Sequence, residues 1–159
     1  MVKIPDKSHC LICKQKPKLF HSLNDDEFRG VINNRILIQY RAGETIIKQE
    51  SRATQAFVLH SGFVKVFVEG PQNKNLIVRY GKAGDFIGIS GLFTDQKYSF
   101  SVSAVNDCLA CFFDYELLEE FIDNKPEFAK EIINLLSAEK KHAHSKFLCL
   151  TQKQIPGRV

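Results

Sequence analysis

The sequence predicts a mainly β protein, an antiparallel barrel or sandwich, followed by a long C-terminal helix. Between residues 36 and 113, short runs rich in Val, Ile, Phe and Tyr alternate with glycine-containing turns. Many short strands at this spacing are typical of closed or layered antiparallel sheets. Beyond residue 125, apolar residues recur at steps of three, four and seven, interrupted at Glu139 and Lys140. This period indicates an amphipathic helix.

Local signals place the individual elements. The expected strands are 36–40, 45–47, 56–60, 63–68, 76–80, 86–87, 98–104 and 108–113. A short helix is expected over roughly 25–33, because Asn24 or Ser22 can cap its first N–H groups and the acidic residues after them favour the positive end of the helix dipole. Asp114 is suited to cap a helix over 116–122. Pro126 is suited to open the last helix, since its missing N–H would have no partner there.

The last helix is expected to be longer than the domain it packs on. A helix of about 25 residues spans ~37 Å, so half of its apolar seam is expected to meet a second copy in a parallel homodimer. The alternative, that the whole seam packs on its own barrel, stays open. The residues expected at the dimer interface are Ile132, Leu136, Ala143, Phe147 and Leu150.

Bulk composition excludes several classes of protein. The 159 residues suffice to bury a core without disulfides or metal. The formal charge of +4 is dispersed, with no run longer than Lys140-Lys141, and does not indicate a nucleic-acid-binding arm. No stretch approaches the roughly 18 apolar residues of a membrane span, and the polar start lacks the apolar core of a secretory signal. We therefore expect a cytoplasmic protein without a membrane partner, whose five cysteines are thiols or metal ligands.

One segment carries a family resemblance. The sequence Ala83-Gly-Asp-Phe-Ile-Gly-Ile-Ser-Gly-Leu-Phe93 resembles the phosphate-binding cassette of the cyclic-nucleotide-binding β-roll of catabolite activator proteins. The motifs at 42–44, 61–67 and 157–159 occur in the order and spacing of the Crp/Fnr family. The resemblance implies an antiparallel β-roll, a jelly-roll-like double-stranded β-helix, with a long C-terminal dimerisation helix. It divides the chain into a cysteine-containing segment 1–22, a roll 23–124, a dimerisation helix 125–153 and the start of a linker at 154–159.

The resemblance also implies a function. The chain is expected to be the effector-sensing and dimerisation domain of a bacterial Crp/Fnr-type transcription regulator, and not an enzyme. In that family the linker leads to a winged helix-turn-helix, so contact with DNA and with RNA polymerase is expected only through a domain that this chain lacks.

Two alternatives to a regulator stay open. The first is a stand-alone β-roll that senses a ligand or redox state and acts through protein partners. The second is a cupin-like enzyme, which needs a converging set of ligands on strands. His142-x-His144 has the cupin spacing but falls in the expected helix, where the two side chains splay about 200° apart.

The resemblance places an effector pocket around the cassette and the middle of the last helix. Its expected residues are Gly84, Asp85, Phe86, Ile87, Gly88, Ile89, Ser90, Ser99, Phe100, Ser101, Ala143 and His144. Such a cassette holds a cyclic nucleotide through backbone N–H groups, an arginine on the phosphate and a carboxylate on the ribose.

Neither charged contact is present at its expected position. This chain has Ile89 at the ribose position, and Ser99 with Phe100 at the arginine and the hydroxyl residue that follows it. Arg79 and Lys97 are the candidates to replace that arginine from another direction. We therefore expect that cAMP is not the effector. A more apolar small molecule in the same cavity, or a cassette kept only as structure, are the interpretations that stay open.

The cysteines resemble part of a metal site. Cys10-x-x-Cys13 with Cys111 resembles part of the set by which the Fnr branch holds an oxygen-sensitive iron–sulfur cluster. The third N-terminal cysteine is missing, and His21 as fourth ligand would give a Cys₃His set, a composition typical of structural zinc. A bound metal or cluster, a redox-active thiol pair and inert cysteines all stay open. Cys108 and Cys111 are three apart on an expected strand, so only one of them can join a common centre.

Overall fold

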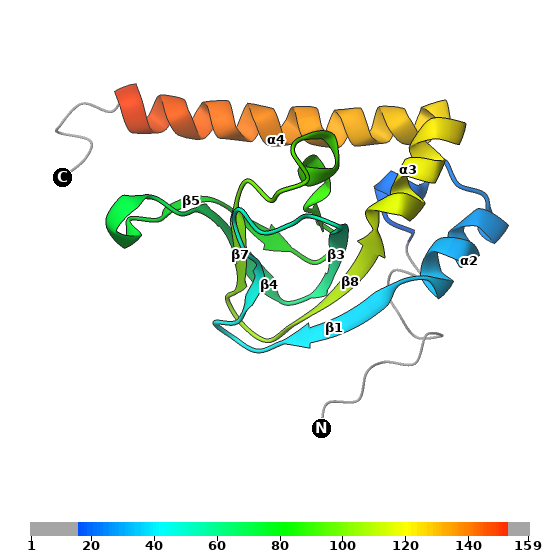
Figure 1. Ribbon diagram of the computed structural model, residues 1–159, viewed down its shortest axis with the longest axis horizontal. Coiled ribbons are helices and arrows are strands. Elements are labelled where there is room, and N and C mark those ends of the chain that lie inside the picture. The colour runs from blue at the N-terminus through cyan, green and yellow to red at the C-terminus, as the bar shows by residue number, and fades with distance from the viewer. Residues whose placement is uncertain (1–15, 153–159) are drawn as a thin grey trace.

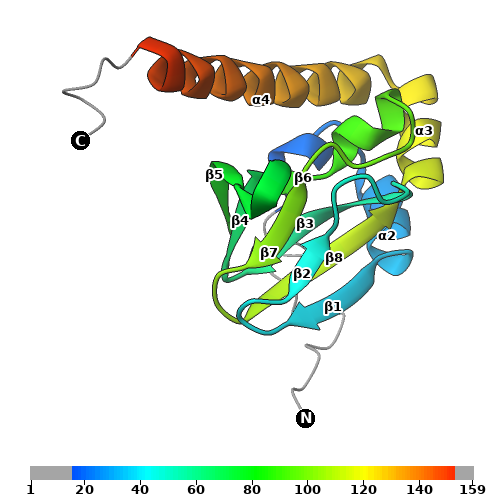
Figure 2. The same ribbon diagram turned by 60° about the vertical axis from the view of Figure 1, so that its left-hand side comes forward.

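The computed structural model describes residues 16–152. They form an antiparallel β-roll of two four-stranded sheets, with short helices at one end and the long helix α4 (Pro126–Gln152) along one side (Figures 1 and 2). The strands are β1 (Ile36–Tyr40), β2 (Thr45–Ile47), β3 (Gln55–Ser61), β4 (Phe63–Val68), β5 (Leu76–Lys82), β6 (Phe86–Ile87), β7 (Ser101–Ala104) and β8 (Cys108–Asp114). The other helices are η2 (Lys18–Phe20), α2 (Asp25–Asn33), η3 (Pro71–Asn73), η4 (Ile89–Phe93) and α3 (Tyr115–Asn124).

The two sheets confirm the predicted mainly β fold. One sheet has the strand order β1-β8-β3-β6 and the other β2-β7-β4-β5, and the strand pairs are antiparallel. The strands begin and end within two residues of their predicted bounds, except for one run. The run 98–104 becomes a strand only from Ser101, and the backbone of Tyr98 pairs instead with the turn after β2: its N–H donates to the Ser51 carbonyl oxygen at 3.1 Å and its carbonyl oxygen accepts from the Glu50 N–H at 2.8 Å. The Tyr98 hydroxyl also donates a hydrogen bond to the carbonyl oxygen of Gln55 at 2.6 Å, so Tyr98 links the segment before β7 to β3.

Helix α2 begins as its sequence predicts. The Asn24 side chain accepts a hydrogen bond from the Glu27 backbone N–H at 2.9 Å, and the Glu27 side chain accepts one from the Asn24 backbone N–H at 2.9 Å. This reciprocal cap satisfies two N–H groups that the helix itself cannot pair. Its inner face, made by Phe28, Val31 and Ile32, is buried.

An aromatic cluster joins the roll to the helices. The fully buried ring of Phe20, in η2, lies 5.4 Å from that of Phe113 and 6.2 Å from that of Phe86, both of the roll. The same ring lies 5.8 Å from that of Phe28 in α2 and 6.1 Å from that of Phe128 in α4. The core therefore runs without a break from η2 through the roll into α4. No pattern in the sequence predicted the helix at residues 18–20.

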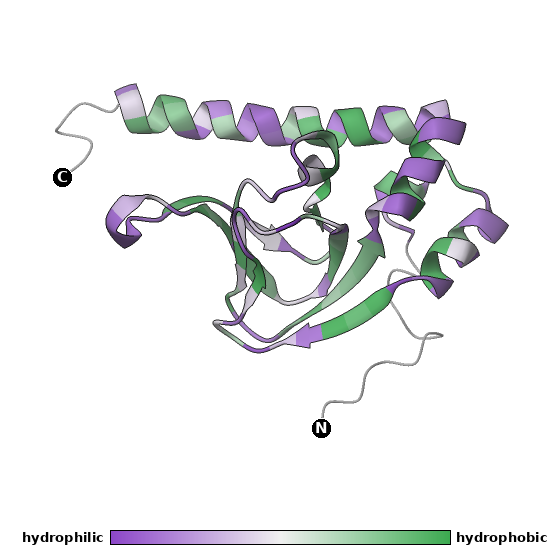
Figure 3. Ribbon diagram, viewed as in Figure 1, coloured by the Kyte–Doolittle hydropathy of each residue, from purple (hydrophilic) through white to green (hydrophobic). Residues whose placement is uncertain are grey.

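Helix α4 divides into a buried and an exposed half. Phe128 and Ile132 lie in the chain's own core, with 0% and 2% of their surface exposed. Toward the C-terminus, Phe147 is 68% exposed and Leu148 53%. In Figure 2 this end extends past the roll, and Figure 3 shows apolar residues on it. Within residues 16–152, no helix combines the length and apolar character needed to cross a membrane.

Replacing the central ring of the aromatic cluster should destabilise the whole domain. Phe20→Ala removes a fully buried side chain that contacts four other rings, and such a truncation typically costs about 3–5 kcal/mol of unfolding free energy. Phe93→Ala, at a ring that is 51% exposed, is the matched control and should cost less than about 1 kcal/mol. Urea denaturation followed by circular dichroism measures both. Equal losses for the two variants would contradict the central role of Phe20.

Candidate functional site

The cassette forms a tight turn between β6 and η4. Gly88 has a φ of 97°, which is favourable only for glycine. A Cβ atom added at Gly91 would lie 2.6 Å from the Cβ of Ala53 and 2.8 Å from the hydroxyl oxygen of Tyr115. These glycines therefore let the turn pack closely on the roll, whether or not a ligand binds.

Two buried tyrosines fix this turn from inside the protein. The hydroxyl of Tyr115, the first residue of α3, donates a hydrogen bond to the carbonyl oxygen of Gly88. Burial raises the pKa of Tyr115 and of Tyr98, so both phenols stay neutral donors. A Cβ at Gly88 would lie 3.5 Å from the ring of Tyr98. Side chains of the protein itself thus hold the cassette turn.

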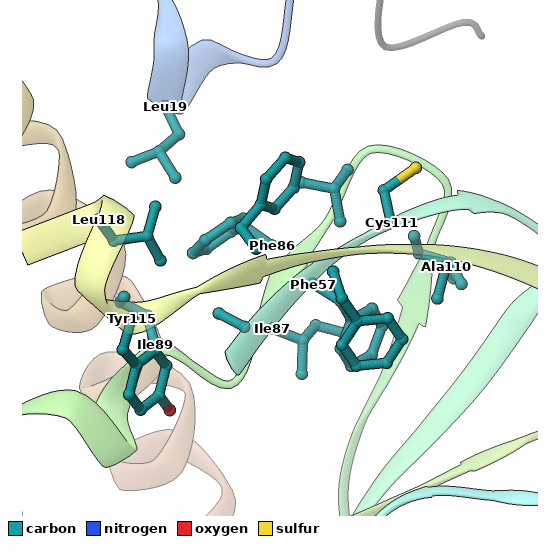
Figure 4. Packing of buried hydrophobic residues seen from close by; sticks show 14 of the residues in the cluster. Leu19, Phe57, Phe86, Ile87, Ile89, Ala110, Cys111, Tyr115 and Leu118 are labelled. Atoms are coloured by element: carbon teal, nitrogen blue, oxygen red, sulfur yellow. The ribbon is translucent and has the colours of Figure 1, made fainter. Parts of the chain in front are cut away.

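Half of the ten expected pocket residues at the cassette are buried. Phe86, Ile87 and Ile89 are 6%, 0% and 0% exposed. Figure 4 shows Ile89 beside Tyr115, and Phe86 on the opposite side of the sheet from Ile87 and Phe57. Gly88 is also buried, Ser90 and Phe100 are half-buried, and Gly84 and Ser99 are exposed. Ile89, at the position of the expected ribose carboxylate, packs against the protein's own residues.

A carboxylate lies next to the expected pocket residue Ser101. The fully buried Ser101 hydroxyl donates to a carboxylate oxygen of Glu69 at 2.5 Å and accepts from the Gln49 backbone N–H at 2.9 Å. The Lys48 ammonium lies 2.6 and 2.7 Å from the two Glu69 oxygens. Hydrogen bonds from Lys48 and then Ser101 lower the pKa of the Glu69 carboxyl. Lys48 and Glu69 thus form a formally neutral pair beside Ser101.

A cavity lies between β5 and α4. It has a volume of about 670 Å³, within the range of about 300–1,000 Å³ typical of small-molecule sites. Its lining residues are Lys18, Leu19, Phe63, Arg79, Tyr80, Gly81, Lys82, Asp85, Phe86, Glu131, Asn134, Leu135, Ala138, Glu139 and His142. Of the expected pocket residues it contains Asp85 and Phe86. Ala143 and His144 are exposed and lie outside this lining.

Arg79 carries the charge at the centre of this groove. Its side chain is 20% exposed, and its two terminal nitrogens lie 3.6 Å from an Asp85 oxygen and 3.5 Å from a Glu139 oxygen. The same Asp85 oxygen accepts a hydrogen bond from the Lys82 backbone N–H at 2.9 Å. Burial raises the pKa of Glu139, and the nearby Arg79 opposes that shift. Sequence analysis identified Arg79 as a replacement cation but treated Glu139 only as a break in the helix seam.

The described residues do not by themselves make up the expected metal site. Cys10 and Cys13 lie outside the described residues. Cys111 is fully buried on the face of β8 opposite Cys108, because the pairing of β8 with β1 runs without a shift between them. His21 is exposed, and its Nε2 lies 2.8 Å from the Lys16 carbonyl oxygen. Residues 16–152 contain no group of three or more His, Cys, Asp or Glu that could hold a metal ion.

The expected dimer residues fall on two sides of α4. Ile132 lies in the core of its own chain and Leu136 is half-buried. Ala143, Phe147 and Leu150 are exposed. The neighbouring Ile133 is 62% exposed, and sequence analysis did not single it out because the helical period fits both isoleucines.

The chain is similar to a known domain family and to solved structures. The family model described as the cyclic nucleotide-binding domain matches residues 37–125. The chain belongs to the cyclic nucleotide-binding domain family. The catabolite activator protein of Thermus thermophilus matches 84% of this chain and 62% of its own, with a TM-score of 0.70 and 22% identity. That likeness confirms the antiparallel β-roll with a long C-terminal helix.

Curated relatives of this cyclic nucleotide-binding domain are regulatory proteins. The fumarate and nitrate reduction regulatory protein of Vibrio cholerae is 24% identical over 155 residues, which is 95% of this chain and 61% of that protein. The electron transport regulator A of Shewanella oneidensis is 25% identical over the same number of residues, with the same coverage. The chain thus has homologues among Crp/Fnr regulators and spans about 61% of the length of these two.

The cassette should not bind cAMP with high affinity. Losing an arginine–phosphate pair and a carboxylate–hydroxyl bond costs about 1.5–3 kcal/mol each, which lowers affinity by roughly two to four decades. Calorimetric titration with cAMP and cGMP should therefore show no saturable binding below about 100 µM. A family member that binds cAMP serves as positive control. A micromolar dissociation constant for either nucleotide would show that other residues of the protein make the charged contacts.

Proposed function

We propose that this chain is the effector-sensing and dimerisation domain of a Crp/Fnr-type DNA-binding transcription regulator. The observation that carries the proposal is a cyclic nucleotide-binding roll joined through one core to a helix that exposes Phe147, Leu148 and Leu150 at its far end. The names of its relatives as regulatory proteins support it. The roll senses an effector, and α4 conveys the change to its partner and to the domain that follows.

The exposed face of α4, from Ile133 to Leu150, is proposed to meet a second copy of itself. Steps of three and four residues join Ile133, Leu136, Lys140, Ala143, Phe147 and Leu150. This is the spacing of a coiled-coil seam. Ile133, Phe147 and Leu150 are 62%, 68% and 42% exposed, and a parallel two-fold contact would remove this apolar surface from water. Lys140 places one charged layer within the seam.

The effector is proposed to be a small molecule other than cAMP. Packing of Ile89 in the core, at the position of the expected ribose carboxylate, acts against a cyclic nucleotide at the cassette. The expected residue set around the cassette, with Ala143 and His144, stays a proposal. So does the metal or cluster at Cys10, Cys13, Cys111 and His21, which rests on the resemblance to the Fnr branch.

We propose that a further C-terminal domain of the whole regulator makes the contacts with DNA and with RNA polymerase. The protein is proposed to act in the cytoplasm. To test the contact with DNA, the complete reading frame from the source genome is expressed and used to select genomic DNA fragments, beside residues 1–159 alone. The complete protein should enrich a two-fold symmetric sequence and the isolated chain should enrich none. A reading frame that stops at Val159 would contradict the regulator and favour the stand-alone sensor.

A charge on the exposed half of α4 should weaken the dimer. Phe147→Glu replaces an apolar contact worth about 1.5–3 kcal/mol when buried with two facing carboxylates, so the dimer dissociation constant should rise at least about tenfold. Ser145→Glu, two residues away and on the opposite side of the helix, is the control and should change little. Sedimentation velocity over a concentration series measures both. A wild-type chain that stays monomeric at all concentrations would refute the interface.

A further inference from the structure

We propose that the groove between β5 and α4 binds a small organic anion with an apolar body, whose anionic group takes the Arg79 guanidinium away from Glu139. This inference rests on the proposed effector-sensing function and names the site and the ligand class. It moves the effector from the cassette turn to the groove beside α4.

The groove is lined by apolar side chains and by the charged side chain of Arg79. Leu19, Phe86, Leu135 and Ala138 contribute apolar surface, from η2, β6 and α4. Arg79 contributes a guanidinium on a side chain that is four-fifths buried. An apolar pocket with a few convergent polar groups is the usual form of a small-molecule site. The cassette turn, in contrast, is filled by Ile89 and Tyr98.

The two acids hold the guanidinium loosely. Each terminal nitrogen of Arg79 has one carboxylate oxygen at 3.5 or 3.6 Å, whereas charge-assisted hydrogen bonds lie at about 2.7–2.9 Å. A ligand carboxylate can accept two parallel hydrogen bonds from both nitrogens, a geometry that neither acid now uses. An incoming anion therefore gains shorter contacts than those it displaces.

The charges around Glu139 determine when an anion is accepted. From β5 and the turn after it come Arg79, Lys82 and Asp85, and from η2 comes Lys18. Helix α4 itself contributes Glu131 and His142. When Glu139 is ionised and His142 is not counted, the groove has three cations and three carboxylates. When Glu139 takes up a proton, the cations Lys18, Arg79 and Lys82 outnumber Asp85 and Glu131, and the groove becomes complementary to an anion.

Glu139 couples binding to protonation. Burial already raises the pKa of its carboxyl, and Arg79 is the group that lowers it. Once a ligand anion occupies the guanidinium, the buried carboxyl loses that compensation, so its pKa rises further and it takes up a proton. Binding should therefore strengthen as pH falls. It also breaks the ion pair that joins the middle of α4 to the edge strand of the roll.

The test uses calorimetric titration of the chain with benzoate, 3-phenylpropionate and decanoate, with 3-phenylpropanol as the uncharged counterpart. Titrations run in Bis-Tris and in imidazole buffers, whose different ionisation enthalpies reveal proton uptake. At least one carboxylate should bind saturably below about 10 mM, at least threefold more tightly at pH 6 than at pH 7.5 and with proton uptake. The alcohol should bind at least tenfold more weakly.

Three variants separate the steps. Arg79→Met should weaken carboxylate binding at least tenfold, and Arg29→Met, at an exposed arginine outside the groove, should leave it unchanged. Glu139→Gln should still bind the anion, without proton uptake at the groove and with a flatter pH dependence. Thermal melting followed by circular dichroism confirms that each variant is folded, and Glu139→Gln keeps the test decisive if Arg79→Met is not.

Several outcomes would overturn the inference. They are no binding of any probe up to about 10 mM, equal binding of the alcohol, full binding by folded Arg79→Met, or unchanged proton uptake in Glu139→Gln. If the probes fail while the dimer forms and the complete protein selects DNA, the groove proposal alone is wrong. If the probes bind as described but the complete protein selects no DNA, the regulator proposal is wrong and the groove remains.

Discussion

The contact of the Phe20 ring with four other aromatic rings is the constraint on which the relation of roll and helix depends. Phe86 lies just before the Gly88 turn and Phe128 in the first turn of α4, and both rings lie within 6.2 Å of Phe20. Protein interiors are packed as densely as organic crystals, so such rings cannot shift one at a time. The N-terminal half of α4 is therefore fixed to the roll, and movement of the helix has to arise further along.

Packing requires the glycines of the cassette even without a bound nucleotide. A side chain at Gly91 would collide with Ala53 and with the Tyr115 hydroxyl, and Gly88 adopts a φ that disfavours side chains. The Tyr115 hydroxyl also ties the Gly88 carbonyl to the start of α3. Packing alone thus preserves the motif, while the position beside Gly88 holds Ile89 in the core. A sequence can resemble the cassette closely and still lack its charged contacts.

Local patterns were sufficient to predict most of the elements. The cap at Asn24, the start of α4 at Pro126 and the short strands follow from hydrogen-bonding or steric needs within a few residues. The Phe20 contacts and the Arg79–Glu139 ion pair join residues far apart in the chain, and no local signal reveals them. Choosing between Ile132 and Ile133 as the buried residue requires the rotation of the helix about its axis, which a seam with apolar residues at both positions leaves undetermined.

Helix α4 is held by a different interaction in each of its parts, and this division determines where a signal can act. Its first turns are packed in the core through Phe128 and Ile132, and its last turns expose Phe147. Between them, Glu139 attaches the helix to Arg79 through a largely buried ion pair. Desolvation offsets much of the attraction in such a pair. A modest change in charge at this point is therefore enough to alter how the helix is held, whereas moving the packed first turns would require repacking the aromatic core.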